Sequence, residues 1–270
     1  MKKVQHFIFS WARVTEDVKK IQKDLQDSGY QVDVINCDDN PQDGWINVGN
    51  DYWLYGQFFT CLKNFDFDND YLNIMLGDVE TDDYSKLFKR TEEVVSEVEN
   101  VGIYAPDYGN KEKCWWIIDN VSVERFDSSN VIEFDDSNLV AGTMCDFFYL
   151  TIHKDIVKAY SDFIEDLVKD HSDYEFWRGH GWGIDLILCS FAHMQNKFVI
   201  RDKKIVLGHD VDNGHSGPDS SISYNKLMDG FKKYMGADYD RAQSKIKFAL
   251  DRCPPHENKT IYTTIEELWK

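Results

Sequence analysis

The chain has 270 residues, of which 42% are hydrophobic and 14% aromatic, so it can bury a large core and global disorder is excluded. Its 48 acidic and 30 basic residues give a formal net charge of −18, and this field repels nucleic-acid backbones and anionic membranes. Nucleic-acid binding is therefore excluded as the main activity. An acidic protein that handles phosphates needs a metal ion or a few local cations.

The sequence also indicates where the protein resides. Only about five apolar residues precede Arg13, too few for the apolar region of a signal peptide, and no run approaches the length of a membrane span. The six cysteines are scattered without a Cys-x-x-Cys pair, which is typical of reduced thiols that fill a core. We expect a cytoplasmic protein.

The first 105 residues alternate between strand and helix patterns with short connections. Residues 4–11 predict a strand, Thr15 is expected to cap the helix that follows, and residues 31–37 predict a second strand. That strand ends at Asp38 and its polar neighbours. An acidic residue there commonly meets a base or ribose in nucleotide-binding α/β proteins, but an ordinary turn fits the residues equally well. No Gly-rich phosphate fingerprint follows the first strand, which argues against a Rossmann or P-loop protein.

Residues 71–83 form the segment around which the chain is organised. They begin as a short apolar run of strand length and end in a cluster of carboxylates. Open α/β sheets place their ligands at the carboxyl ends of such strands. Asp78 and Glu80 stand two residues apart, so both can reach one hard divalent cation, and the other positions remain for water or phosphates. A strand that runs into an acidic turn is the alternative.

The remaining elements continue this α/β pattern. A helix after the loop 44–50 carries Tyr55 on an apolar stripe that predicts core packing, and residues 85–99 predict another helix. Residues 101–105 predict a strand that ends at Pro106. Beyond Tyr108 the pattern changes. Strand-like segments are expected at 113–118, 131–134 and 139–150, an amphipathic helix at 156–168, and two helices and a tail beyond residue 221.

Residues 177–185 form a loop rich in glycine and tryptophan that opens another helix. Asp185 lies in the first turn, where the helix dipole favours a carboxylate, so a purely structural role remains open for it. The glycines let the backbone approach a ligand closely, and tryptophan faces are good platforms for sugar rings. Residues 204–209 then predict a strand that ends in His209.

In this order, these features resemble those of a GT-A fold glycosyltransferase, over roughly residues 4–215. In that family an Asp-x-Asp pair binds a divalent ion that grips the diphosphate of a nucleotide sugar. Here the pair is Asp78 and Glu80, which still supplies two carboxylates. The segment 181–185, Gly-Trp-Gly-Ile-Asp, is similar to the Gly-Trp-Gly acidic motif of beta-linked galactosyltransferases. Those enzymes usually have two acidic residues where this chain has Ile184 and Asp185.

The resemblance implies a role for each matching residue. Asp185 would bind the acceptor hydroxyl and remove its proton, with an inverting mechanism as a corollary. Asp78, Glu80 and His209 would bind Mn²⁺ or Mg²⁺, with His215 as a substitute for the last. Such an ion acts as a Lewis acid on the leaving diphosphate, and a well-placed base contributes roughly 10²–10⁴-fold.

The expected ligands follow from the same resemblance. The donor is a nucleotide sugar, expected to be a UDP-sugar, and the acceptor is a glycan or another hydroxyl compound. The nucleoside is expected over the ends of the first two strands, where Arg13 can meet the diphosphate. The expected donor-binding residues are Ser10, Trp11, Arg13, Asp38, Tyr55, Gly77 and Asp78. The expected acceptor-binding residues are Trp182, Gly183 and Thr143.

The prediction as a whole is an α/β fold with a GT-A-like mixed, mostly parallel sheet flanked by helices. Residues 1–220 would form the catalytic domain, with a nucleotide-sugar half at 1–105 and an acceptor half at 106–220, and residues 221–270 a helical extension. The activity would be that of a metal-dependent, hexosyltransferase-like enzyme. Two alternatives remain open: a metal-dependent nucleotidyltransferase on a similar sheet, and a non-catalytic sugar-binding or assembly protein on the same fold.

Overall fold

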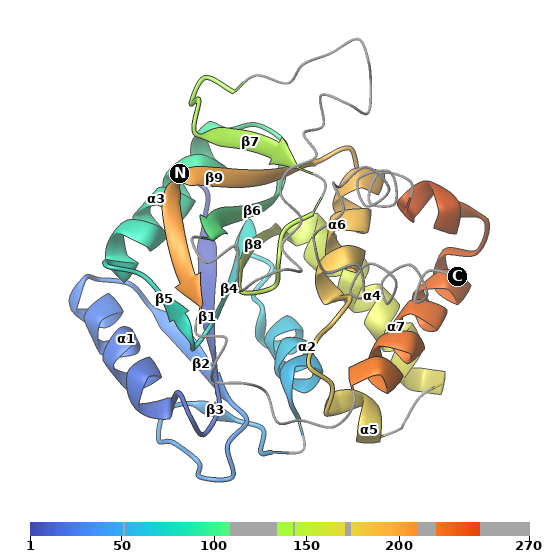
Figure 1. Ribbon diagram of the computed structural model, residues 1–270, viewed down its shortest axis with the longest axis horizontal. Helices are drawn as coiled ribbons and strands as arrows, with labels where there is room; N and C mark the ends of the chain where they lie inside the picture. The colour runs from blue at the N-terminus through green and yellow to red at the C-terminus, as the bar shows by residue number, and fades with distance from the viewer. Residues whose placement is uncertain (51, 109–133, 143, 171–173, 210–219, 244–270) are drawn as a thin grey trace, which may run out of the picture.

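The computed structural model describes residues 1–50, 52–108, 134–142, 144–170, 174–209 and 220–243 (Figure 1). The strands in these residues are β1 (Val4–Ser10), β2 (Val32–Asn36), β3 (Ile46–Asn47), β4 (Tyr71–Leu76), β5 (Val79–Glu80), β6 (Val101–Tyr108), β7 (Leu139–Gly142), β8 (Tyr149–His153) and β9 (Phe198–His209). The helices are α1 (Thr15–Asp27), α2 (Leu54–Asn64), α3 (Tyr84–Glu97), α4 (Lys154–Asp170), α5 (Tyr174–Trp177), α6 (Ile184–Met194) and α7 (Ser220–Met235), followed by a 3-10 turn, Gly236–Asp238.

The strands form one mixed sheet in the order β3-β2-β1-β4-β8-β6-β9-β5, with β7 also paired to β9. β1 pairs in parallel with β2 and β4, and β2 pairs in parallel with β3. β8 is antiparallel to both β4 and β6, so β6 and its parallel partner β9 regain the direction of β1. Six of these nine strands (β1, β2, β3, β4, β6 and β9) therefore point the same way. The predicted mixed, mostly parallel α/β fold is confirmed.

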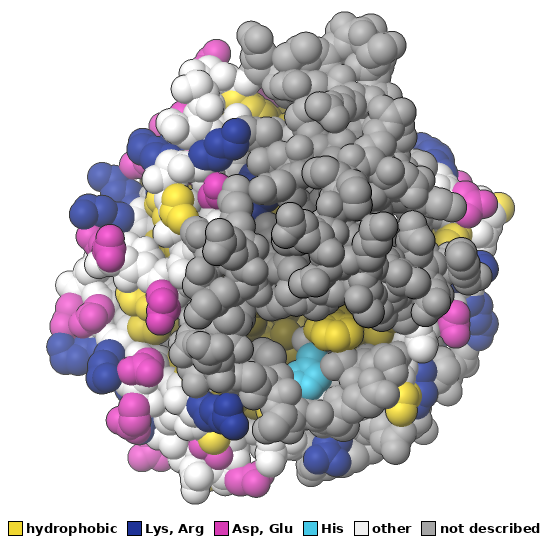
Figure 2. Space-filling view, in the orientation of Figure 1, with side chains coloured by type: hydrophobic (Ala, Val, Ile, Leu, Met, Phe, Trp, Pro, Cys, Tyr) yellow, Lys and Arg dark blue, Asp and Glu magenta, His cyan; other side chains and the backbone are white. Residues whose placement is uncertain are grey.

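Helices cover both faces of the sheet (Figure 1). α1 packs on α3 over one face, and α4 packs against α2, α6 and α7 over the other. The amphipathic pattern explains this placement, because α1 buries Val18, Ile21 and Leu25 toward the sheet. Acidic and basic side chains intermingle over the α1 and α3 side of the face shown in Figure 2, so positive charge is present despite the net charge of −18.

Two contacts fix the carboxyl ends of the central parallel strands. Gln57 of α2 is only 1% exposed, and its Nε2 donates hydrogen bonds of 2.9 Å to the carbonyls of Ser10 and Ile35, which ties the end of β1 to β2. The Gly77 N–H donates to the Phe9 carbonyl at 2.9 Å, just beyond the end of β4. A Cβ on Gly77 would lie 2.8 Å from that carbonyl oxygen, so glycine allows this close approach.

The structure corrects the predicted start of the first helix. Thr15 is the first helical residue and not the cap; Val14 precedes it and makes no side-chain cap hydrogen bond. The Thr15 hydroxyl donates back to the Trp11 carbonyl at 3.1 Å. The Asp83 side chain does cap α3, by accepting a 3.0 Å hydrogen bond from the Lys86 N–H.

Two predicted strand boundaries are also wrong. Pro106 does not end its strand, because β6 continues to Tyr108. The pairing of β6 with β9 shifts register directly after Pro106, and a strand tolerates the missing proline N–H at such an irregularity. The expected strand at 139–150 is two strands, β7 and β8, with a loop between them. The strand-like segments at 113–118 and 131–133 lie outside the described residues.

Both predicted halves contribute strands to the same sheet. The predicted extension at 221–270 includes nearly all of α7, and residues 244–270 are outside the described part of the chain. Four described cysteines, Cys37, Cys61, Cys145 and Cys189, are free and buried, as predicted for core thiols. Within the described ranges, every helix is too short or too polar to traverse a lipid bilayer.

Candidate functional site at the carboxyl edge of the sheet

The topology gathers several polar chain segments at one edge of the sheet. β1, β2 and β4 all end there because they are parallel neighbours. β8 is antiparallel and therefore begins there, and the Leu76 N–H at the end of β4 donates to the Phe148 carbonyl at 2.9 Å. β9 is parallel to β6 and therefore begins at the opposite edge, where α6 ends. α6 runs back across the sheet to reach that point, so it also begins at the carboxyl edge. Open α/β sheets bind ligands at such an edge.

The acidic turn after β4 faces the end of β9. Asp78 is 7% exposed, whereas Glu80 is exposed. β5 pairs antiparallel with β9, so Val79 is opposite His209 and Glu80 is opposite Gly208. A Cβ on Gly208 would lie 2.9 Å from Glu80 Oε2, so the glycine leaves room for this carboxylate. The acidic turn that holds Asp78 and Glu80 therefore lies beside the backbone of His209, although more than 120 residues separate them in the sequence.

The two carboxylates fit a hard divalent cation, because Mg²⁺ and Mn²⁺ prefer oxygen ligands. Among the described side chains, no group of three or more His, Cys, Asp and Glu residues is arranged to hold a metal. The side chains of the two predicted histidine ligands, His209 and His215, lie outside that description. The metal site therefore stays a prediction that rests on Asp78 and Glu80.

The predicted nucleoside-binding residues divide into two groups. Ser10 and Trp11 are buried beneath the edge, and the Trp11 carbonyl accepts the Val14 N–H at 2.9 Å in the turn before α1. Arg13 is exposed in the same turn, and Asp38 is partly exposed after β2. Asp38 Oδ1 accepts the Asn40 N–H at 3.2 Å, which stabilises its own turn. Arg13 and Asp38 are therefore the members of this group with side chains that a ligand can reach.

Tyr55 of α2 contacts the Gly-Trp loop, residues 177–185. Tyr55 is buried, its ring stacks on Phe176 with centroids 4.8 Å apart, and its hydroxyl donates to the Trp182 carbonyl. Tyr55 thus holds the loop in place. Gly181 and Gly183 have φ of 79° and 90°, in the left-handed region that favours glycine. The Trp182 side chain between them is 53% exposed. Thr143, the remaining predicted acceptor contact, lies outside the described residues.

Asp185 lies in the first turn of α6, beside this loop, and is partly exposed. Burial raises the pKa of Asp185 to about 6, although backbone N–H groups at the helix start, including that of Leu186 at 2.8 Å from Oδ1, oppose the rise. Its negative charge contributes, after burial, to raising the pKa values of Tyr160 and Tyr224. Asp185 is therefore a carboxylate with an altered pKa near buried tyrosines. Altered pKa values are typical of functional sites.

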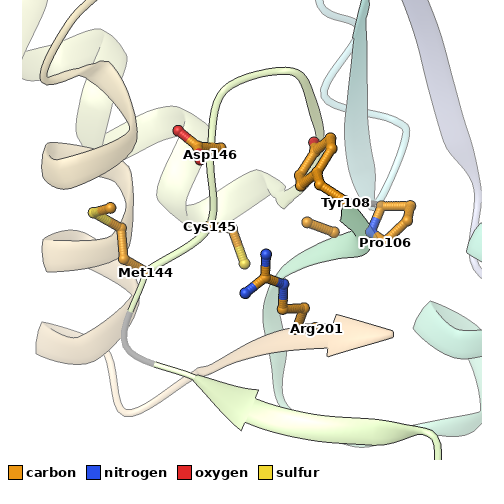
Figure 3. Close-up of a pocket in the computed structure, with 7 residues that line it drawn as sticks. Pro106, Tyr108, Met144, Cys145, Asp146 and Arg201 are labelled. Atoms are coloured by element: carbon orange, nitrogen blue, oxygen red, sulfur yellow. The ribbon is translucent and has the colours of Figure 1, made fainter. Parts of the chain in front are cut away.

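Asp146 is a residue that the sequence-based prediction missed. It lies in the loop between β7 and β8 and is 8% exposed. It lines a small cavity together with Ala105, Pro106, Tyr108, Met144, Cys145 and Arg201 (Figure 3). The available signal was a single acidic residue inside the apolar run 144–150, because a charge in such a run is costly to bury.

Comparisons with known proteins do not establish a family. No protein-family model matches the chain, and no curated protein sequence matches it either. Solved structures similar to the chain include a UDP-glucose pyrophosphorylase complexed with UDP-glucose, at a TM-score of 0.44 and 9% identity, covering 87% of this chain and 98% of that one.

Two further solved structures are similar. One is a glycosyltransferase involved in glycosylation of the major capsid of PBCV-1, at a TM-score of 0.38 and 7% identity, covering 76% of this chain and 94% of that one. The other is a 4-diphosphocytidyl-2C-methyl-D-erythritol synthase from Anaerococcus prevotii, at a TM-score of 0.36 and 14% identity, covering 65% of this chain and 81% of that one. With TM-scores below 0.5, these likenesses carry no inference about activity.

Proposed function

We propose that the chain is a metal-dependent glycosyltransferase that moves a sugar from a nucleotide-sugar donor to a hydroxyl of a glycan or similar acceptor. One observation carries the proposal: the acidic turn after β4 and the Asp185 carboxylate at the start of α6 lie at the same edge of the sheet. Inverting sugar transfer uses both, a place for the donor's diphosphate and a base for the acceptor hydroxyl.

On the donor side, Asp78 and Glu80 would hold a divalent cation, with His209 proposed as a third ligand. When bound, this ion neutralises the charge that develops on the leaving diphosphate. Arg13, exposed in the turn before α1, would add positive charge near the phosphates. Asp38, after β2, would meet the nucleoside. A UDP-sugar is the donor that we expect.

On the acceptor side, Asp185 would take up the proton of the attacking hydroxyl. With its pKa raised to about 6, the carboxyl is mostly ionised at pH 7 and yet basic enough to accept a proton. The Leu186 N–H holds Oδ1, which fixes the orientation of the carboxylate. The exposed Trp182 ring offers a face on which a sugar ring can stack.

The test is a screen of nucleotide sugars with a panel of glycan acceptors, with Mn²⁺, with Mg²⁺ and with chelator. Mass spectrometry would follow the glycosylated product and released nucleoside diphosphate. We expect wild type to form product when Mn²⁺ or Mg²⁺ is present and not when chelator is present. We expect no product from the Asp185→Asn variant. A parallel reaction offers nucleoside triphosphates with sugar 1-phosphates and follows pyrophosphate. Activity in this second reaction alone would replace the proposal with nucleotidyl transfer, and donor binding without turnover in either would favour a non-catalytic protein.

A further inference from the structure

Asp146 is buried in a way that disfavours its charged form. Its Oδ2 is buried and has no hydrogen-bond partner in the described part of the structure. The nearby Arg201 guanidinium pairs with another carboxylate, since its Nε is 3.1 Å from Asp107 Oδ1. Figure 3 shows the Asp146 carboxyl group pointing away from Arg201, whereas the Cys145 thiol points toward it. A buried carboxylate without an ion pair is costly, so a protonated Asp146 is favoured.

Asp185 and Asp146 lie in different environments, although the charge of Asp185 acts on Asp146. Asp185 accepts backbone hydrogen bonds at the start of α6, and these stabilise its anion. Burial, and next the negative charge of Asp185, raise the pKa of Asp146 well above its ordinary value, while Arg201 only partly opposes them. Environments that separate two carboxyl groups in this way keep one protonated while the other is ionised.

The tyrosine and cysteine side chains around the pair are neutral at pH 7, whereas Arg201 and Asp107 form a charged pair. Burial raises the pKa values of Tyr55 on α2, Tyr160 on α4 and Tyr224 on α7, and the charge of Asp185 adds to this in each. Cys145 and Cys189 are buried thiols whose pKa values are raised by burial too, and the charges of Asp146 and Asp185 add to the rise. The Tyr160 hydroxyl is buried without a partner among the described residues, so it can still form a hydrogen bond with a water or a hydroxyl.

We propose that Asp146 is a positioning residue that keeps its proton while Asp185 ionises, so that the pair carries one negative charge, located on Asp185. This inference rests on the proposed role of Asp185 as the base. In the transfer, the acceptor O–H proton would pass to Asp185 and the acceptor oxygen would bond to the anomeric carbon. The bond between that carbon and the diphosphate oxygen would break, and its electron pair would leave with the diphosphate. Asp146 would retain its proton throughout.

The direct test is a carbon-13 NMR titration of the aspartate carboxyl groups in the full chain from pH 4 to pH 9. The Asp146→Asn and Asp185→Asn variants assign the two resonances. We expect the Asp185 resonance to titrate near pH 6 and the Asp146 resonance to remain at its protonated position at pH 7. An Asp146 resonance that titrates in the ordinary range, about pH 4, would overturn the inference. The measurement needs no turnover, so its result is independent of the proposed function.

Thermal unfolding gives a second measurement. The melting temperature of Asp146→Asn relative to wild type should rise from pH 5 to pH 8, because the variant lacks a buried carboxyl that resists ionisation. The matched control is Asp229→Asn, an exposed position on α7, for which the difference should stay constant. A constant or falling difference for Asp146→Asn would contradict the proposal. If that variant does not fold, the wild-type spectrum still decides: no protonated aspartate resonance at pH 7 would refute it.

A pH profile separates positioning from a merely structural role. Wild-type transfer should lose rate at a pH high enough to ionise Asp146, because the second negative charge would act electrostatically on Asp185. Asp146→Asn cannot ionise, so its profile should lack this alkaline loss and keep the acid limb near pH 6. An alkaline loss that persists unchanged in the variant would show that Asp146 does not influence the base.

Discussion

Asp185→Asn should stabilise the fold at pH 8 relative to wild type, and should leave stability almost unchanged at pH 4. Burial raises the pKa of Asp185 from 3.8 to about 6, so the folded state binds this proton more tightly than the unfolded chain does. Between those two values the unfolded chain ionises first, and wild-type stability falls as the pH rises. The carboxyl is neutral in both states at lower pH. Above about pH 6 the carboxyl is ionised in both states, and the loss of wild-type stability is complete.

The size of this effect follows from the difference of about two pH units. At about 1.4 kcal/mol for each unit, the upper bound is ~3 kcal/mol. Since Asp185 is partly exposed and water screens it, we expect ~1–2 kcal/mol at pH 8. The amide oxygen can still accept the Leu186 N–H, so the helix start should remain intact.

Urea unfolding of wild type and Asp185→Asn at pH 4, 6 and 8 would measure this difference in stability, with Asp229→Asn as the exposed control. In the transfer assay the same variant should lose roughly 10²–10⁴-fold in turnover while donor affinity is retained. A stability difference that does not change with pH would refute the altered pKa. Unchanged turnover per folded molecule would reduce Asp185 to a helix-start residue.

Two further predictions concern the backbone that shapes the site. Gln57→Leu leaves the buried Ser10 and Ile35 carbonyls without their amide donor, so it should lower the free energy of unfolding by about 1–3 kcal/mol, as measured by urea titration. Gly77→Ala forces a Cβ to within 2.8 Å of the Phe9 carbonyl oxygen, and overpacking of this kind should cost about 1–3 kcal/mol and weaken donor binding.

Each of these variants has a control on the same kind of element. Lys63→Ala, at an exposed position near the end of α2, should change stability by less than about 0.5 kcal/mol. Gly44→Ala has no atom within 4 Å of the new Cβ but has a φ of 77°, so it reports the cost of backbone conformation without a clash. If Gln57→Leu matched Lys63→Ala, the Gln57 bridge would not hold the strand ends. If Gly77→Ala cost no more stability than Lys63→Ala, close packing would not explain Gly77.

The parts of the fold that sequence predicts are the local ones. β4 was predicted from its apolar run, and α1 from the spacing of its buried residues, because strand and helix periods appear directly in the order of apolar residues. The acidic turn was predicted because its carboxylates directly follow β4 in the sequence. The antiparallel insertion of β8 between β4 and β6 was not predicted, because it depends on pairing between distant segments.

The candidate site shows the same division. Asp185 is recognisable from its Gly-Trp loop, but the role of Tyr55 as a support depends on the Trp182 carbonyl, 127 residues away in sequence. Asp146 was missed because its burial and its electrostatic link to Asp185 arise only when the β7–β8 loop meets the start of α6. Helical periodicity correctly placed Tyr55 in the core, and only the fold shows what its hydroxyl binds.

The central claim is that the acidic turn after β4 binds a nucleotide diphosphate through a metal ion. Isothermal titration of uridine diphosphate into wild type and Asp78→Ala, each with Mn²⁺ and with chelator, tests it most directly. Asp82→Ala, an exposed neighbour in the same acidic segment, is the control, and circular dichroism would check the fold of each variant. The account predicts Mn²⁺-dependent binding in wild type and Asp82→Ala, and its loss in a folded Asp78→Ala. Equal affinities for wild type and Asp78→Ala would contradict it.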